Sequence, residues 1–298
     1  LIFMHGWPSY PILLCIFGFG NGWILTLINS MGTRVKKYPS VKVFNQLYLA
    51  ENIGLVVGTG LTGFIYEQGI GWLFVLIAGI YLVSLIIVGI KFAKVETVDA
   101  SADLTGKRNL FVIIVLLLGL VVVWVMYEQW MSNLAVYLAR FGISTGRYGM
   151  LWTINGILII IFQLLLDWIG RYHATLDLQV ILGAFFMAGS FMLLLFAAHY
   201  GQFVLAMVVL ALGESLLIPG VRAYVNRLSP VAQKGRGQGM VNAFSSIGKA
   251  IGPLFGGLII ERLGYLKLFA ICTVADLIVG MMIGIVLLIL RRGLQTYD

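Results

Sequence analysis

The sequence predicts an all-α fold, a polytopic bundle of membrane helices, and three observations support this prediction. Mean hydropathy is +1.00, with 60% hydrophobic and 11% charged residues. Apolar stretches of the roughly 20 residues that a helix needs to cross the hydrocarbon core recur along the chain. Lysines and arginines collect in alternate connections between these stretches. A water-soluble protein of 298 residues would not need such a pattern, so we expect a multi-pass membrane protein.

The apolar stretches place nine helices in chain order. Three are expected before a polar run and six after it, at 11–31, 41–65, 70–90, 109–131, 148–168, 176–198, 203–225, 238–260 and 267–290. We therefore predict three parts: 1–90 as the remainder of an amino-terminal helical bundle, 91–108 as a cytoplasmic linker, and 109–298 as a carboxy-terminal six-helix bundle.

The basic residues predict the orientation. Of the 20 lysines and arginines, fourteen fall in one set of alternate connections and only four in the other set. Under the positive-inside rule this places the carboxyl terminus in the cytoplasm. The expected location is the plasma membrane. A nucleic-acid binder would gather its net charge of +8 on one soluble face. Here the charges are dispersed along helix ends, so we expect no nucleic-acid partner.

The cysteines and histidines give no support to a disulfide, a metal site or an enzyme. Cys15 and Cys272 both fall within predicted helices, and His5, His173 and His199 fall in connections without ligand spacing. A membrane-embedded enzyme or a sensor is therefore disfavoured, and we expect no cofactor and no metal.

Two glycine-rich stretches repeat at a shift of 194 residues. The shift pairs Gly54 with Gly248, Gly58 with Gly252 and Gly63 with Gly257, and a proline-containing basic connection precedes each copy. Both copies run from the cytoplasm outward, which indicates a parallel repeat about an axis along the membrane normal. Under the same shift, the chain begins near the end of a third helix. We therefore expect an intact protein of twelve helices, of which about nine are present here.

Twelve helices in two halves joined by a polar linker resemble the major facilitator superfamily. The eighth stretch is similar to the antiporter motif of drug/proton antiporters, through Gly248, Gly252, Pro253, Gly256 and Gly257. That motif usually occupies the fifth helix, where this chain has Thr59 and Thr62 instead of the proline and a glycine. Small residues at this spacing let helices approach closely. The motif is therefore either a static helix contact or a seam where the two halves meet and bend.

Two shorter motifs support the resemblance. Asp167, Gly170 and Arg171 are similar to a loop motif of the superfamily, and Tyr127-Glu128-Gln129 resembles a segment of proton-coupled members. The resemblance implies a cytoplasmic gate in which Asp167 lies near the amino end of the helix at 41–65, within reach of Arg222 or Arg227. The alternative is that Asp167 is a solvated loop charge.

Ionisable residues at membrane depth are the main functional signal. A charge at the centre of a membrane helix costs about 3 kcal/mol on insertion scales, so such residues tend to face a cavity or a partner. The resemblance places Glu214 and Glu128 beside the central cavity, where burial favours a neutral carboxyl that can bind and release a proton. Tyr127, Trp152 and Asn155 are the expected cavity residues. Lys249 and Asp276 lie at equal depth, which favours an ion pair between them. Glu51 is an alternative partner for Lys249.

The function expected from these features is proton-coupled efflux of small amphipathic or drug-like compounds by alternating access, as in a multidrug antiporter. The proton gradient would supply the driving force. The alternative is a proton-coupled symporter that imports peptides or other small solutes, because Tyr127-Glu128-Gln129 also resembles the seventh helix of peptide symporters. The expected partners are a small-molecule substrate and the lipid bilayer, and the expected state is a monomer.

Overall fold

The regular structure is entirely helical in the part of the chain that the computed structural model describes, which is 6–35, 37–66, 70–91, 106–170 and 176–290. No strand occurs among these residues. The predicted all-α fold class is therefore confirmed. The predicted linker at 91–108 lies mostly outside the described residues.

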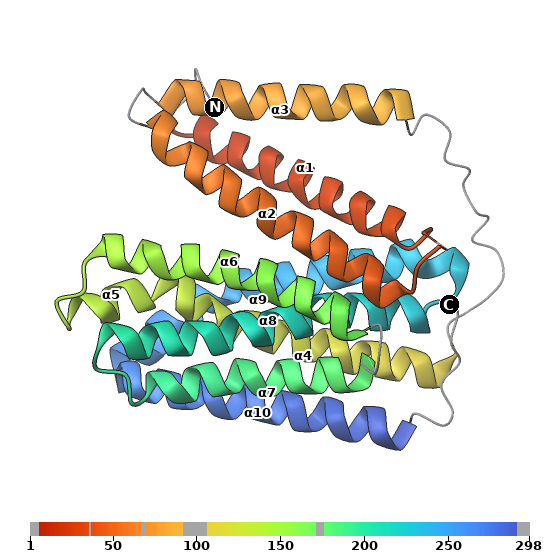
Figure 1. Ribbon diagram of the computed structural model, residues 1–298. Helices are drawn as coiled ribbons and strands as arrows, with labels where there is room; N and C mark the ends of the chain where they lie inside the picture. Colours follow the sequence, from red (N-terminus) through yellow and green to blue (C-terminus); the bar gives the residue numbers. More distant parts are fainter. Residues whose placement is uncertain (1–5, 36, 67–69, 92–105, 171–175, 291–298) are drawn as a thin grey trace.

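Three helices form the first part of the molecule (Figure 1). They are α1 (Ser9–Gly32), α2 (Ser40–Tyr66) and α3 (Ile70–Lys91). Their bounds lie within two residues of the stretches expected at 11–31, 41–65 and 70–90. Helix α3 lies on the outer side of α1 and α2, away from the second part of the molecule (Figure 1), and Tyr81 Oη of α3 donates to Asn21 Oδ1 of α1 at 3.2 Å.

The second part is a bundle of six long helices and two short ones. The long helices are α4 (Lys107–Ser132), α6 (Thr145–Gly170), α7 (Leu176–Leu194), α8 (Tyr200–Leu228), α9 (Lys234–Leu263) and α10 (Tyr265–Leu290). The short ones are α5 (Leu134–Ala139) and the 3-10 helix η1 (Val231–Gln233). The sequence did not predict α5 or η1, because neither is long enough to show a helical period.

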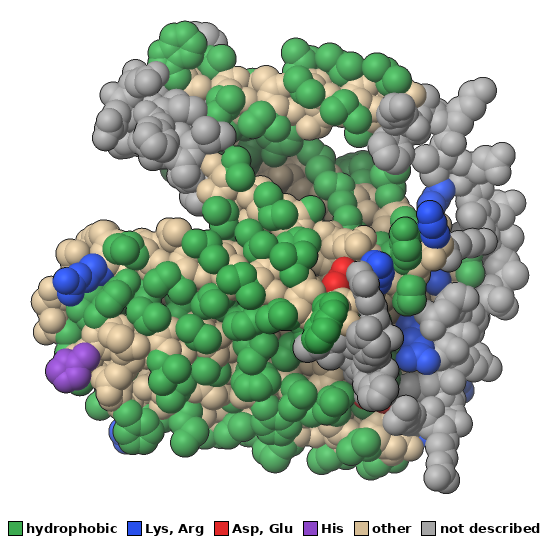
Figure 2. All heavy atoms as spheres, viewed as in Figure 1, with side chains coloured by type: hydrophobic (Ala, Val, Ile, Leu, Met, Phe, Trp, Pro, Cys, Tyr) green, Lys and Arg blue, Asp and Glu red, His purple; other side chains and the backbone are tan. Residues whose placement is uncertain are grey.

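Length and composition agree with a membrane location. Among the described residues, seven helices are long and apolar enough to span a bilayer, and Phe74–Ile90 is a shorter apolar helix. Apolar side chains cover most of the visible face of α6, α7 and α10 (Figure 2). Most of the visible Lys and Arg side chains lie toward the end where α1 ends and α2 begins (Figure 2). This is the end that the charge count assigns to the cytoplasm.

The two parts meet mainly at that same end. Helices α1 and α2 approach α8 and α9 there and lean away from the second bundle toward the opposite end (Figure 1). Polar side chains join them across the contact: Asn226 Nδ2 donates to Ser40 Oγ (2.7 Å), and Asn242 Nδ2 donates to Thr26 Oγ1 (3.1 Å). The two parts are therefore in contact on the basic side and lie further apart at the other end (Figure 1).

Helix α8 passes through Pro219 without ending. A proline inside a helix has no N–H, so the carbonyl four residues earlier loses its donor. Here that carbonyl belongs to Ser215, and Gln163 Nε2 of α6 donates to it at 2.8 Å. Gln179 Nε2 of α7 donates to the next carbonyl, Leu216 O, at 3.1 Å. Gln163 thus replaces the one backbone donor that the proline removes, and Gln179 adds a bond to the neighbouring carbonyl, which is how membrane helices tolerate such residues.

This replacement predicts a non-additive pair of mutations. Gln163→Leu leaves the Ser215 carbonyl without a donor, and we expect it to lower the free energy of unfolding by about 1–3 kcal/mol. In a Pro219→Ala background the alanine N–H can donate to the same carbonyl. Gln163→Leu is then expected to cost less than half as much. The measurement is unfolding of the purified protein in detergent, analysed as a double-mutant cycle. An equal cost in both backgrounds would show that Gln163 does not substitute for the missing donor.

Candidate functional site

A buried carboxylate lies at the middle of α8. Glu214 is 6% exposed, and its two oxygens accept three hydrogen bonds from three other helices. Tyr48 Oη of α2 donates to Oε1 at 2.6 Å. Tyr127 Oη of α4 donates to Oε2 at 3.1 Å, and Asn155 Nδ2 of α6 donates to the same oxygen at 3.3 Å. All three donors are neutral, so the carboxylate is solvated by side chains rather than neutralised by a cation.

Close packing of α7 against α8 sets the direction of Glu214. A Cβ added at Gly183 would lie 2.6 Å from the backbone nitrogen of Leu217, and one added at Gly213 would lie 2.7 Å from that of Met187. Helix backbones can approach this closely only where small residues face one another. Because Gly213 faces α7, its neighbour Glu214 is turned around α8 toward α2, α4 and α6.

A second polar contact joins α2 to α8 next to this site. Arg222 Nη1 lies 3.0 Å from Glu51 Oε1, and the two side chains are 9% and 33% exposed respectively. The Arg222 backbone carbonyl also accepts a hydrogen bond from Gln238 Nε2 of α9 at 2.9 Å. On α2, Asn52 Nδ2 donates to the Tyr48 carbonyl at 2.9 Å. Charged and polar groups of both parts therefore also join α2 to α8 about two helical turns along α8 from Glu214.

Aromatic rings form the wall beside Glu214. The rings of Trp124 and Tyr127 meet edge to face with centroids 5.0 Å apart, and Trp152 lies 6.1 Å from Tyr127. Tyr148 continues the row, 6.4 Å from Trp152. The Lys249 ammonium of α9 lies over the Trp124 ring, 3.9 Å from its centroid. An aromatic wall next to carboxylates suits an organic cation, since ring faces attract positive charge.

The glycine-rich face of α9 packs against α4. A Cβ at Gly248 would lie 2.6 Å from the Val121 carbonyl oxygen. Gly252 lies against the side chain of Glu128, and Gln129 Nε2 donates to the Gly252 carbonyl at 2.9 Å. Gly256 lies against the side chain of Gln129, whereas nothing lies within 4 Å of a Cβ at Gly257. Because α4 and α9 belong to the same bundle, Gly248, Gly252 and Gly256 form a helix contact within one part of the molecule, the first of the two interpretations.

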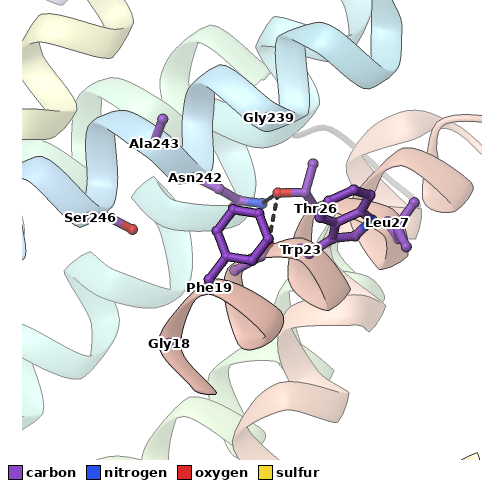
Figure 3. A pocket seen from close by; sticks show the side chains of 10 residues that line it. Gly18, Phe19, Trp23, Thr26, Leu27, Gly239, Asn242, Ala243 and Ser246 are labelled. Carbon is purple, nitrogen blue, oxygen red and sulfur yellow. Dashed lines mark hydrogen bonds between the residues drawn. The ribbon is translucent and has the colours of Figure 1, made fainter. Parts of the chain in front are cut away.

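An open cavity of about 520 Å³ lies between α1 and α9. Its walls include Phe19 and Trp23 of α1 and Asn242 and Ser246 of α9, and the hydrogen bond between Thr26 and Asn242 crosses it (Figure 3). No ionisable side chain of the described part of the chain lines this cavity. It is therefore separate from the hydrogen bonds of Glu214, which come from α2, α4 and α6.

Comparison with known proteins gives the family. The sequence model of the Major Facilitator Superfamily matches residues 125–296. The MFS-type transporter YttB of Bacillus subtilis (strain 168) is 36% identical over 272 residues, which cover 89% of this chain and 68% of YttB. The chain belongs to the major facilitator superfamily.

More distant relatives agree with this assignment. Multidrug resistance protein 1 of Bacillus subtilis (strain 168) is 24% identical over 257 residues, covering 82% of this chain and 64% of that protein. A crystal structure of the peptide transporter POT superimposes with a TM-score of 0.55 at 19% identity. It covers 84% of this chain and 54% of that transporter, and it supports the major facilitator fold alone. The chain thus spans about half to two thirds of the length of these relatives.

The structure brings several predicted site residues of this superfamily member together. Glu214, Tyr127 and Asn155 are hydrogen-bonded, and Trp152 packs on Tyr127. Glu128 is half-buried and lies beside Gly252, one turn along α4 from Trp124. Trp130, another aromatic of the same helix, is fully buried against Phe191.

The structure does not form the predicted ion pairs of Lys249. Glu51 pairs with Arg222, and Lys249 lies on Trp124. Asp276 is fully buried, and neither of its carboxylate oxygens has a hydrogen-bond partner among the described residues. The predicted ion pair rested on the equal depth of Lys249 and Asp276 in the membrane. It does not form, because the two side chains point in different directions around their helices.

Of the two partners predicted for Asp167 at the cytoplasmic gate, Arg222 is engaged elsewhere. Asp167 lies at the end of α6 and is half-buried, but Arg222 pairs with Glu51 and not with Asp167. Gly170 is the last residue of α6. Arg171 lies outside the described residues, as do the side chains of Thr59 and Thr62.

Sequence reasoning missed Tyr48 altogether. It lies four residues before Asn52 on α2 and is 5% exposed. The available signal was its position three residues before Glu51, close to one helical turn, which places both on neighbouring parts of one face. Nothing in the residue pattern indicates that Tyr48 contacts a residue 166 positions later.

The contact between α4 and α9 predicts opposite effects for two glycines of one motif. Gly248→Ala places a methyl group against the backbone of α4, and we expect a loss of about 1–3 kcal/mol of stability from overpacking. Gly257→Ala adds a methyl group in open space and is expected to be neutral or to stabilise the helix by up to about 1 kcal/mol. Thermal unfolding of the two purified variants in the same detergent measures the difference. Equal melting temperatures for both variants would contradict this packing.

Proposed function

We propose that this protein is a proton-coupled exporter of small amphipathic cations that works by alternating access in the plasma membrane. The observation that carries the proposal is the Glu214 carboxylate with its three neutral donors. A carboxylate without a direct basic partner can be neutralised only by a proton or by a cationic substrate. The two therefore compete for one negative charge, which is the basis of exchange transport.

The donors to Glu214 come from both parts of the molecule. Tyr48 belongs to α2 of the first part, whereas Tyr127 and Asn155 belong to the second bundle. Hydrogen bonds to an ionised acceptor are roughly twice as strong as those to a neutral one. Protonation of Glu214 therefore weakens the bond to Tyr48 across the two parts. This provides a physical link between proton binding and the relative movement of the bundles.

The direction of proton entry follows from the arrangement of the helices. The two parts are in contact on the basic side and splay apart on the other side (Figure 1). With the basic side in the cytoplasm, this is the state that receives a proton from outside and releases the substrate. The Glu51–Arg222 ion pair keeps the cytoplasmic side closed until the bond to Tyr48 is weakened.

The aromatic wall and the relatives support an amphipathic substrate. Trp124, Tyr127 and Trp152 offer ring faces and edges next to Glu128 and Glu214. The similarity to Multidrug resistance protein 1 agrees with a drug-like substrate. The likeness to the peptide transporter POT concerns the fold alone, so no observation of its own favours peptide import. We propose that the protein acts as a monomer in the bilayer, with its carboxyl terminus in the cytoplasm and no cofactor other than the proton gradient.

The proposal predicts a specific defect for Glu214→Gln. Glutamine resembles the protonated carboxyl and cannot exchange its proton, so transport driven by a pH gradient is expected to fall to the level of liposomes without protein. Exchange of substrate across the membrane without a gradient is expected to persist, because it does not require Glu214 to bind or release a proton. The measurement is ethidium transport by the purified protein in proteoliposomes, with and without an imposed pH gradient.

Glu261→Gln is the matched control. Glu261 is exposed near the end of α9 and touches none of the groups at Glu214, so gradient-driven transport is expected to equal that of the unmodified protein. Gradient-driven transport that survives Glu214→Gln would exclude Glu214 as the proton carrier.

A further inference from the structure

Lys249 stands at the boundary between two faces of α9. Gly248, Gly252 and Gly256 face α4, and Gly239, Asn242 and Ser246 line the cavity next to α1. With 3.6 residues per turn, position 249 falls between these two faces, one turn beyond Ser246. The Lys249 side chain is exposed, and its ammonium lies 3.9 Å from the centroid of the Trp124 ring.

The ammonium of Lys249 is held by a ring face and by nearby charges rather than by a fixed partner. No hydrogen bond or ion pair ties it to another described residue. Glu214 belongs to the same region, because it accepts a hydrogen bond from Tyr127, whose ring meets the Trp124 ring. Glu128 is placed close by, because its side chain lies against Gly252, three residues along α9. Such a cation can leave the ring without breaking a directional bond.

The position of this ammonium has the features of a binding site for an organic cation. It combines an indole face with two carboxylates, and a cation over a tryptophan ring gains about 0.5–2 kcal/mol depending on its hydration. The cavity beside it has two further aromatic walls, Phe19 and Trp23 (Figure 3). A flat or bulky apolar group could lie in this cavity while its charged atom replaced the ammonium on Trp124.

We propose that Lys249 is a tethered cation that occupies the substrate's own charge site when the transporter is empty. The inference rests on the proposed function and makes its substrate class more specific: lipophilic monovalent cations. Lys249 lies on the Trp124 ring between transport cycles and swings away when a substrate cation takes its place there. Each substrate must therefore displace the Lys249 ammonium, and this competition lowers the apparent affinity for the substrate. Only a compound whose own affinity for the site is high enough to displace Lys249 is bound.

The test is binding of tetraphenylphosphonium to the purified protein in detergent, measured by equilibrium dialysis. Lys249→Met keeps most of the apolar stem and removes the charge, so the dissociation constant is expected to fall about tenfold, within the range of one cation–π contact. Lys249→Arg keeps a cation on the ring and is expected to bind as the unmodified protein does. Lys249→Gln, a second neutral variant, is expected to match Lys249→Met if both remain monodisperse.

Two controls separate this competition from other effects. Lys267→Met removes one positive charge from an exposed site on α10 and is expected to leave the dissociation constant unchanged. In a Trp124→Leu background, the gain from Lys249→Met is expected to shrink to less than about threefold, since the contested ring is absent. Triphenylphosphine oxide, a neutral probe of related shape, is expected to show no gain.

Several results would overturn the inference. They are unchanged or weaker tetraphenylphosphonium binding by Lys249→Met, an equal gain in Lys267→Met, or no binding by any variant. If these occur while Glu214→Gln still abolishes gradient-driven transport, the proposed proton coupling stands and only the role of Lys249 falls. If binding responds as expected but Glu214→Gln stays coupled, the proposed proton carrier falls and the tethered cation stands.

Discussion

The arrangement of this site depends on one constraint, the need to solvate a carboxylate that has been removed from water. Burying an unpaired charge costs several kcal/mol even after a protein relaxes. Glu214 meets that requirement with hydrogen bonds from Tyr48, Tyr127 and Asn155, each on a different helix. The donors cannot be moved independently of their helices. The level of Glu214 is therefore where α2, α4, α6 and α8 are held together, and any change in its charge alters the contact of α2 with the second bundle.

The helix framework was predictable from the sequence because the bilayer imposes a length on each apolar run. The nine long helices of the described residues begin and end within about four residues of the expected stretches. The exceptions have physical reasons. Helix α5 has only six residues, and its buried Leu134, Tyr137 and Leu138 span little more than one turn, which is too short to show a helical period in the sequence. The charge count predicted which side would be basic, but it contained nothing about how far the two parts would splay.

The site was only partly predictable, since a sequence gives the depth of a residue more readily than its direction. Glu214 and Tyr127 were recognised as members of a cavity from the family resemblance, and the structure joins them. Tyr48 was missed because a tyrosine in an apolar helix is common, and its partner is distant in the chain. Depth also suggested the pairing of Lys249 with Asp276. The direction of Asp276 follows instead from α10, whose Gly280, one turn further on, faces Ala184 of α7. Asp276 is thereby turned into the second bundle, and Lys249 is turned toward α4.

The glycine motif connects these observations. Its resemblance to an antiporter sequence suggested a moving seam, yet its glycines bring α9 against α4 within a single bundle. That close approach places the backbone of α9 beside Trp124 and Glu128. Larger residues at Gly248 or Gly252 would push α9 outward and carry the Lys249 ammonium away from the indole ring. The motif therefore affects the site by setting the distance between two helices. Because α4 and α9 can touch, Lys249, the Trp124 ring and Glu128 lie close together. The small size of glycine on α9 thus determines which charged groups of α4 and α9 can lie close together.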